Sequence, residues 1–136
     1  MASLHFVYSV SSRPVAEVES ALVSSTVHGA DLRFHGVVRD SEEGRTISGI
    51  EYTHYECMAA NELRKIGEAM MAEFPGHLAL VHHVVGFVAA GEASILIRVQ
   101  TPHSAAGFDL CREYLRRIKS TVPIWKKPVF VEEIPS

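Results

Sequence analysis

Three lysines near the C-terminus are the residues of this sequence best placed to do chemistry. Lys126 and Lys127 directly follow Trp125, the only tryptophan in the chain. Lys119 ends a periodic segment just upstream, and Pro123 stands between. Because proline cannot continue a helix and favours extended geometry in the residue before it, we expect a helix end, a turn, and the lysine pair returning close to Lys119. The Trp125 ring is expected to be buried and to anchor that turn.

Lysines held close together on a partly apolar surface have a distinctive chemistry. Their ammonium groups repel, which favours the neutral amine and makes proton transfer near neutral pH more feasible, and the group also attracts an anionic substrate. A solvated basic patch is the alternative, and it is the commoner interpretation of a lysine pair taken alone. Lys119 is expected within about 20° of Phe108 on the apolar face of its helix, where either chemistry or snorkelling of the ammonium group to water would explain it.

Two further residues are candidates for binding an anion. Arg39 ends a predicted strand beside a polar loop, which suits an anion ligand, although pairing with Asp40 or Glu42 at the surface is the commoner arrangement for an arginine. His103 directly precedes a predicted helix. It could bind an anion together with the free amides of the helix N-terminus, or cap that helix.

The histidines and cysteines do not form a metal-binding pattern. His82 and His83 are neighbours on a predicted strand, so their side chains point to opposite faces and cannot both reach one ion. Cys57 and Cys111 show neither metal-ligand nor redox spacing and are expected to be buried, reduced thiols. We therefore predict no metal and no cofactor.

Composition limits the class of protein. The chain has 136 residues, of which 47% are hydrophobic and 21% charged, as expected for one globular domain with a core that needs no disulfide. The net charge is −3, so no domain-wide basic field argues for nucleic-acid binding. No apolar run reaches membrane-spanning length, and we expect a soluble cytoplasmic protein without a membrane partner.

The predicted elements alternate irregularly along the chain. Strands are expected at Leu4–Val10, Ala30–Arg39, Ile47–Tyr55, His77–Val85 and Ala93–Thr101, with a short last strand near Val129–Val131. Helices are expected from Pro14, over Met58–Phe74 and over Ser104–Ser120, with Asp40–Gly44 as a polar loop and Gly86–Gly91 as a turn. This order predicts an α+β fold, with three helices packed on a mainly antiparallel sheet.

Several of these stretches, taken in order, resemble one family: the catalytic (large) subunit of molybdopterin synthase. The most specific part is Pro-Ile-Trp-Lys-Lys, which follows a lysine at the end of a helix. The other matching parts are Phe34–Asp40, Glu51-Tyr52 with Tyr55–Ala59, Gly86–Glu92, and His103 with Phe108. The resemblance covers nearly the whole chain.

The resemblance implies a fold, an activity and partners. It implies a single domain over residues 1–136 with an α/β-hammerhead-like fold. The family makes the dithiolene of molybdopterin from cyclic pyranopterin monophosphate, as a step in molybdenum cofactor biosynthesis. Sulfur comes from a small ubiquitin-like subunit whose C-terminal Gly-Gly tail ends in a thiocarboxylate. A homodimer of large subunits lies within a heterotetramer, and each pocket borrows residues from the neighbouring large subunit.

The resemblance also assigns roles to residues. The essential lysines of the family map onto Lys119 and Lys126 as the catalytic residues. Substrate contacts map onto Phe34, Arg39 and His103, and Lys127 is assigned to substrate binding with them.

The sequence departs from the family pattern at three positions. Ser104 and Val84 stand where the family usually has arginine, and Pro128 stands where it has glutamate. Two expected cations are therefore missing, one of them near the predicted phosphate site. An active enzyme is favoured because the lysines and Arg39 remain. The alternative is a diverged homologue that binds the small subunit or a pterin without efficient sulfur transfer.

Overall fold

The computed structural model describes residues 5–131, which form eight strands and three helices. In chain order these are β1 (Phe6–Ser11), α1 (Val15–Ser20), β2 (Ala30–Val37), β3 (Ser41–Glu42), β4 (Arg45–His54), α2 (Glu56–Glu73), β5 (Leu78–Val84), β6 (Gly86–Ala89), β7 (Ala93–Thr101), α3 (Ser104–Thr121) and β8 (Ile124–Phe130). No helix within residues 5–131 is long and apolar enough to cross a membrane.

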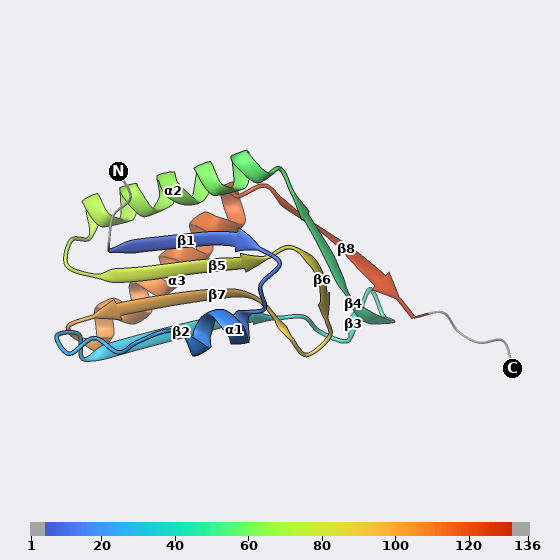
Figure 1. Ribbon diagram of the computed structural model, residues 1–136, viewed down its shortest axis with the longest axis horizontal. Coiled ribbons are helices and arrows are strands. Elements are labelled where there is room, and N and C mark those ends of the chain that lie inside the picture. The colour runs from blue at the N-terminus through green and yellow to red at the C-terminus, as the bar shows by residue number, and fades with distance from the viewer. Residues whose placement is uncertain (1–4, 132–136) are drawn as a thin grey trace, which may run out of the picture.

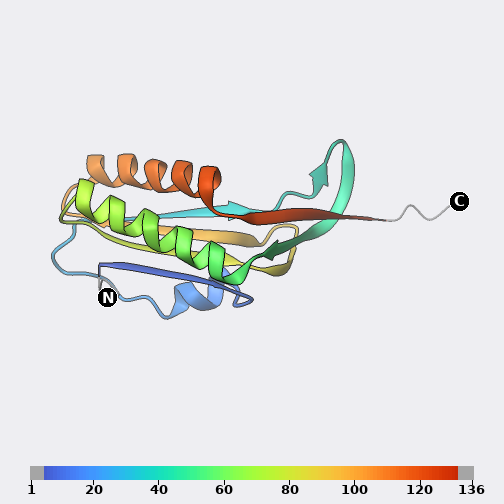
Figure 2. The ribbon, with the colours of Figure 1, turned by 90° about the horizontal axis from the view of Figure 1, so that it is seen from above.

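The larger sheet has the strand order β1-β5-β7-β2. Only the β1–β5 pair is parallel in this sheet, and β5–β7 and β2–β7 are antiparallel. Helices α2 and α3 cover one face and the short α1 lies on the other (Figures 1 and 2). The main core forms between the sheet and the two long helices, where Leu63, Met70, Val81, Ile97 and Tyr114 are almost completely buried. The predicted α+β class, with three helices and mostly antiparallel strands, is confirmed.

The smaller sheet is built around β4 and extends beyond one end of the larger sheet (Figure 1). Strand β4 pairs antiparallel with β3, β6 and β8. The prediction that Gly86–Gly91 is only a turn is wrong, because Gly86–Ala89 forms β6 against Gly49–Tyr52. Gly86 has a φ of 91°, a conformation that glycine adopts readily. This bend lets the chain leave the larger sheet and enter the smaller one.

The last strand is longer than predicted. It begins at Ile124 instead of near Val129, so that Trp125 and both following lysines pair with β4. Trp125 is not buried as expected: it is 50% exposed, and its ring packs edge-on against Tyr55 with 5.1 Å between the ring centroids. The aromatic pair therefore covers the outside of the strand instead of filling a core.

The buried face of α3 is rotated from the predicted one. Phe108 is 64% exposed, whereas Gly107, Leu110, Tyr114 and Ile118 are buried. The reason lies at Gly107, where a Cβ atom would come within 2.7 Å of Leu32 Cδ1. Because glycine permits this close approach to β2, the helix turns the Gly107 side toward the sheet and Phe108 toward solvent.

Candidate active site

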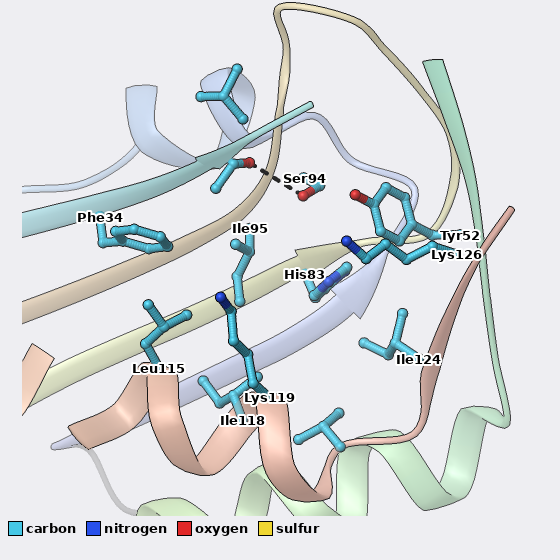
Figure 3. Close-up of a pocket in the computed structure, with 13 residues that line it drawn as sticks. Phe34, Tyr52, His83, Ser94, Ile95, Leu115, Ile118, Lys119, Ile124 and Lys126 are labelled. Carbon is cyan, nitrogen blue, oxygen red and sulfur yellow. Dashed lines mark hydrogen bonds between the residues drawn. The ribbon is translucent and has the colours of Figure 1, made fainter. Parts of the chain in front are cut away.

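Lys119 and Lys126 line one cavity of about 330 Å³. This agrees with the prediction that the chain turns after the helix and brings Lys126 close to Lys119. Lys119 lies in the last turn of α3 and Lys126 on β8, and both side chains reach toward the same space (Figure 3). Both side chains are exposed. The cavity of the isolated chain is therefore open to an incoming ligand.

The sequence between the lysines explains how they meet. Helix α3 ends at Thr121, and Val122 takes an extended conformation with φ −80° and ψ 121° immediately before Pro123. Strand β8 then begins, with Lys126 in register with Tyr52 of β4. Alternation along a strand places Ile124 and Lys126 on one face, and both line the cavity.

The cavity combines an apolar wall with unneutralised positive charge. Apolar side chains that line it include Phe34, Ile95, Leu115, Ile118 and Ile124. No lining residue among those described is an aspartate or glutamate, and neither lysine forms an ion pair within residues 5–131. Two cations without a protein counter-ion beside an apolar wall are suited to a ligand that has an anionic part and a flat or apolar part.

Two further polar residues of the cavity, Tyr52 and His83, were not predicted as site residues. Their rings pack edge-on with 5.2 Å between centroids. Burial lowers the pKa of His83 to about 4, although a hydrogen bond to the Val84 carbonyl oxygen opposes the shift, and Lys126 lowers the pKa further. Tyr52 belongs to the Glu51-Tyr52 stretch that carried the family resemblance, which was a signal in the sequence for this pair.

The prediction that His82 and His83 face opposite ways is confirmed. His82 is fully buried, where its Nε2–H donates to the Arg13 carbonyl oxygen at 2.8 Å and Nδ1 accepts from the Ser9 hydroxyl at 2.6 Å. His83 instead lines the cavity on the other face of β5. The structure within residues 5–131 gathers no group of three histidine, cysteine, aspartate or glutamate side chains that could hold a metal ion. The prediction that both cysteines are buried is wrong for Cys57, which is exposed, whereas Cys111 is partly buried.

Of the predicted substrate-binding residues, only Phe34 lines the cavity with the lysines. Arg39 follows β2, is 81% exposed in its side chain, and lies 3.5 Å from the Glu42 carboxylate, which is the surface pairing left open by the sequence. Lys127 is exposed and does not line the cavity, because it falls on the opposite face of β8 from Lys126.

His103 is remote from the cavity of its own chain. It precedes the first residue of the 18-residue α3, whose last turn holds Lys119. At about 1.5 Å per residue, roughly 25 Å of helix separates the two. His103 occupies the N-cap position of α3, as one alternative predicted, but its side chain makes no capping hydrogen bond. A single chain therefore does not bring Arg39, Lys127 or His103 to the lysines.

The three departures from the family pattern lie in different surroundings. Val84 is 4% exposed and belongs to the core between α1 and the smaller sheet. Ser104 is exposed as the first residue of α3. Pro128 belongs to β8 and pairs with Ile50 of β4. Strand β8 is an edge strand, where the missing N–H of proline is tolerated. None of the three lines the cavity.

The sequence and the fold were compared with known proteins. The family described as MoaE protein matches residues 10–121. A molybdopterin synthase catalytic subunit from Taeniopygia guttata is 38% identical over 121 residues, which cover 88% of this chain and 77% of that protein. The human protein of the same description is 38% identical over 113 residues, covering 83% of this chain and 60% of its own length. This chain thus spans less than two thirds of the human relative.

Solved structures share the fold. The X-ray crystal structure of molybdopterin synthase from Staphylococcus aureus matches with a TM-score of 0.80 and 28% identity, covering 98% of this chain and 95% of that chain. A complex of subunits 1 and 2 of the molybdopterin-converting factor from Helicobacter pylori matches with a TM-score of 0.69 and 22% identity, covering 94% and 90%. The resemblance found in the sequence is confirmed, and this chain belongs to the MoaE family of molybdopterin synthase catalytic subunits.

Proposed function

We propose that this protein transfers sulfur from the thiocarboxylated C-terminal glycine of a small ubiquitin-like carrier to cyclic pyranopterin monophosphate, forming the dithiolene of molybdopterin. The observation that carries this proposal is the pair of cavity lysines, Lys119 and Lys126, which have no counter-ion among the described residues. Both reactants are anions: the donor ends in a thiocarboxylate and the acceptor carries a phosphate. A cavity with two free ammonium groups attracts both.

The two lysines have a chemical task in such a transfer. When the thiocarboxylate sulfur attacks a carbon of the pterin side chain, negative charge develops on oxygen, and an ammonium group at hydrogen-bond distance stabilises it. A lysine can also move the protons that the reaction requires. The apolar wall at Phe34 and Ile95 offers a surface for the flat pterin ring.

The proposed assembly is a homodimer of this chain within a heterotetramer in the cytoplasm. Arg39 and His103 lie outside the cavity of their own chain, so a role in substrate binding requires a second copy to bring them to it or a rearrangement of the Arg39 loop. The small carrier is the other partner, and its tail enters the open cavity. The Helicobacter pylori relative was solved as a complex of two subunits, which supports a partner of this kind.

The experiment is a reconstitution. The purified chain is incubated with cyclic pyranopterin monophosphate and the thiocarboxylated carrier, and molybdopterin is measured. Product should form with the intact carrier and should be lost with a carrier that lacks its last two residues, because a glycine tail lets backbone approach closely in a narrow channel. Equal product from the shortened carrier, or from free sulfide alone, contradicts the tail mechanism.

The second candidate is a diverged homologue that binds the carrier or a pterin without efficient transfer. The observation that favours it is the loss of positive charge: Val84 is a core residue, Ser104 is neutral, and Arg39 is paired with Glu42. Binding of carrier and pterin with no product in the reconstitution would establish this candidate.

A further inference from the structure

His83 is a polar residue of the cavity that the proposed roles of the lysines leave unused. It lines the same cavity as Lys119 and Lys126, and its ring lies close to Lys126 in Figure 3. Other groups that act on it electrostatically are His82, its neighbour on β5, and His54 on β4. The edge-on contact between the Tyr52 and His83 rings positions His83 from the β4 side.

The hydrogen bonding of His83 determines which nitrogen carries the proton. Nδ1 lies 2.8 Å from the Val84 carbonyl oxygen. A carbonyl oxygen can only accept, so Nδ1 is the donor and carries the hydrogen. Burial holds the pKa at about 4, so the ring is neutral near neutral pH and Nε2 keeps its lone pair.

Nε2 is free to meet a ligand. It has no hydrogen-bond partner among residues 5–131. Every fully buried side-chain nitrogen or oxygen in that part of the chain has a partner, so Nε2 must reach accessible space. The accessible space beside His83 is the cavity that it lines.

The proposed function requires a proton acceptor after sulfur has been transferred. Attack by the thiocarboxylate sulfur leaves the carrier joined to the pterin through an acyl thioester. To free the sulfur, a water oxygen must bond to the acyl carbon while the carbon–sulfur bond breaks. The electron pair of that bond stays on sulfur as a thiolate, and the carrier regains an ordinary carboxylate. Water gives up two protons: one during attack and one as the new carboxylic acid ionises to solvent.

We propose that His83 is a further catalytic residue, whose Nε2 accepts the proton of the water that hydrolyses this acyl thioester. The inference rests on the proposed function. As ammonium groups, Lys119 and Lys126 donate hydrogen bonds to the oxyanion but offer no lone pair. The neutral imidazole supplies the proton acceptor in the same cavity. The lysines thus stabilise the oxyanion while His83 takes the proton of the attacking water.

The test compares His83→Asn with the wild type in a single turnover of the full complex. The asparagine amide can keep the donor to the Val84 carbonyl oxygen, but it places nothing where Nε2 was. Thioester hydrolysis should slow by about 10²- to 10⁴-fold, and the carrier–pterin adduct should accumulate and be detectable by intact mass. Hydroxylamine, a nucleophile that needs no base, should release the adduct at the same rate from variant and wild type.

Two controls separate a catalytic role from a structural one. His54→Asn removes a neighbouring imidazole that does not line the cavity and should hydrolyse the adduct at the wild-type rate. His83→Gln places a hydrogen-bonding but non-basic group near the position of Nε2, and it should block hydrolysis as His83→Asn does. Binding of the carrier should be unchanged in both His83 variants.

A measurement on the wild type keeps the inference testable even if both His83 variants fail to fold. Because the ring is already neutral, the hydrolysis rate should stay level between about pH 6 and pH 8. A rate that rises about tenfold per pH unit across this range indicates hydroxide or a lysine as the base and overturns the proposal. If His83→Asn hydrolyses the adduct at the wild-type rate, the role of His83 is also overturned, whereas the proposed function is unaffected. Failure of the wild type to form any adduct instead defeats the proposed function.

Discussion

Lys126 of β8 and Tyr52 of β4 are in register across an antiparallel pair, and both side chains line the same cavity. This pairing turns Lys126 toward the end of α3. Lys119 lies there in the last helical turn, before Pro123 in the chain. The catalytic pair of the proposed mechanism therefore depends on the contact between two strands that are distant in sequence.

Lys119→Ala and Lys126→Ala should each reduce molybdopterin formation by about 10²-fold or more, because each removes an ammonium group from the cavity. The free energy of unfolding in urea should change by less than about 0.5 kcal/mol, since both side chains are exposed and neither forms an ion pair within residues 5–131. Lys65→Ala, at an exposed lysine paired with Glu62, is the matched control and should keep full activity. A lysine variant that unfolds readily would assign that lysine a structural role instead.

Ser104→Arg should tighten binding of cyclic pyranopterin monophosphate by about tenfold or more, since a charge-assisted hydrogen bond contributes about 1.5–3 kcal/mol. Ser104 lies at the end of α3 remote from the cavity of its own chain, so this gain requires a second copy that brings the arginine to the site. Arg112→Ala should change affinity little, because Arg112 is exposed on α3, about two helical turns after Ser104, and does not line the cavity. Calorimetric titration of both variants decides the matter. Unchanged affinity in Ser104→Arg combined with lost affinity in Arg112→Ala would move the anion site to Arg112.

The protein expressed alone should be a homodimer at micromolar concentration. The proposed second copy is needed because His103 and the cavity lysines lie at opposite ends of α3. Light scattering gives the mass directly, and a value near the 15.0 kDa of one chain would refute the dimer.

Stability should fall as the solution is acidified from about pH 7 to pH 5. Burial lowers the pKa of His83 to about 4 and also lowers the pKa of His77. Below about pH 6.5 the unfolded chain binds protons that the folded rings do not, so stability is lost as pH falls through this window. For His83 alone the loss is about 2 kcal/mol. Urea unfolding of wild type and His83→Asn at both pH values tests this, and an equal loss in the two proteins would contradict it.

Gly67→Ala should destabilise the protein by about 1–3 kcal/mol, although alanine is the better helix former. A Cβ at this position in α2 would overlap the Phe6 ring, which is 6% exposed in the core. Thermal unfolding measures the change. In a protein that carries Phe6→Leu, Gly67→Ala should reduce the free energy of unfolding by less than it does in the wild type, because the smaller side chain leaves room for the added methyl group.

Local chemistry alone predicted a large part of the fold. The strand at Ala93–Thr101 was predicted with its observed bounds, because its apolar run lies between turn residues and is buried on both faces. Pro123 determined where α3 ends, since a proline constrains its own backbone and that of the residue before it. Alternation along a strand was enough to place His82 and His83 on opposite faces. Each of these results depends only on neighbours in the chain.

Features that depend on contacts between distant segments were decided by the tertiary structure. The outward position of Phe108 follows from how closely Gly107 approaches Leu32, and strand β6 exists because β4 offers an edge to Gly86–Ala89. Likewise Trp125 lies outside because pairing with Thr53 sets the register of β8. His83 could not be assigned to the site from its sequence neighbours. Its place beside Lys126 arises only where two sheets and the end of α3 meet, and burial at that junction is what leaves the imidazole neutral.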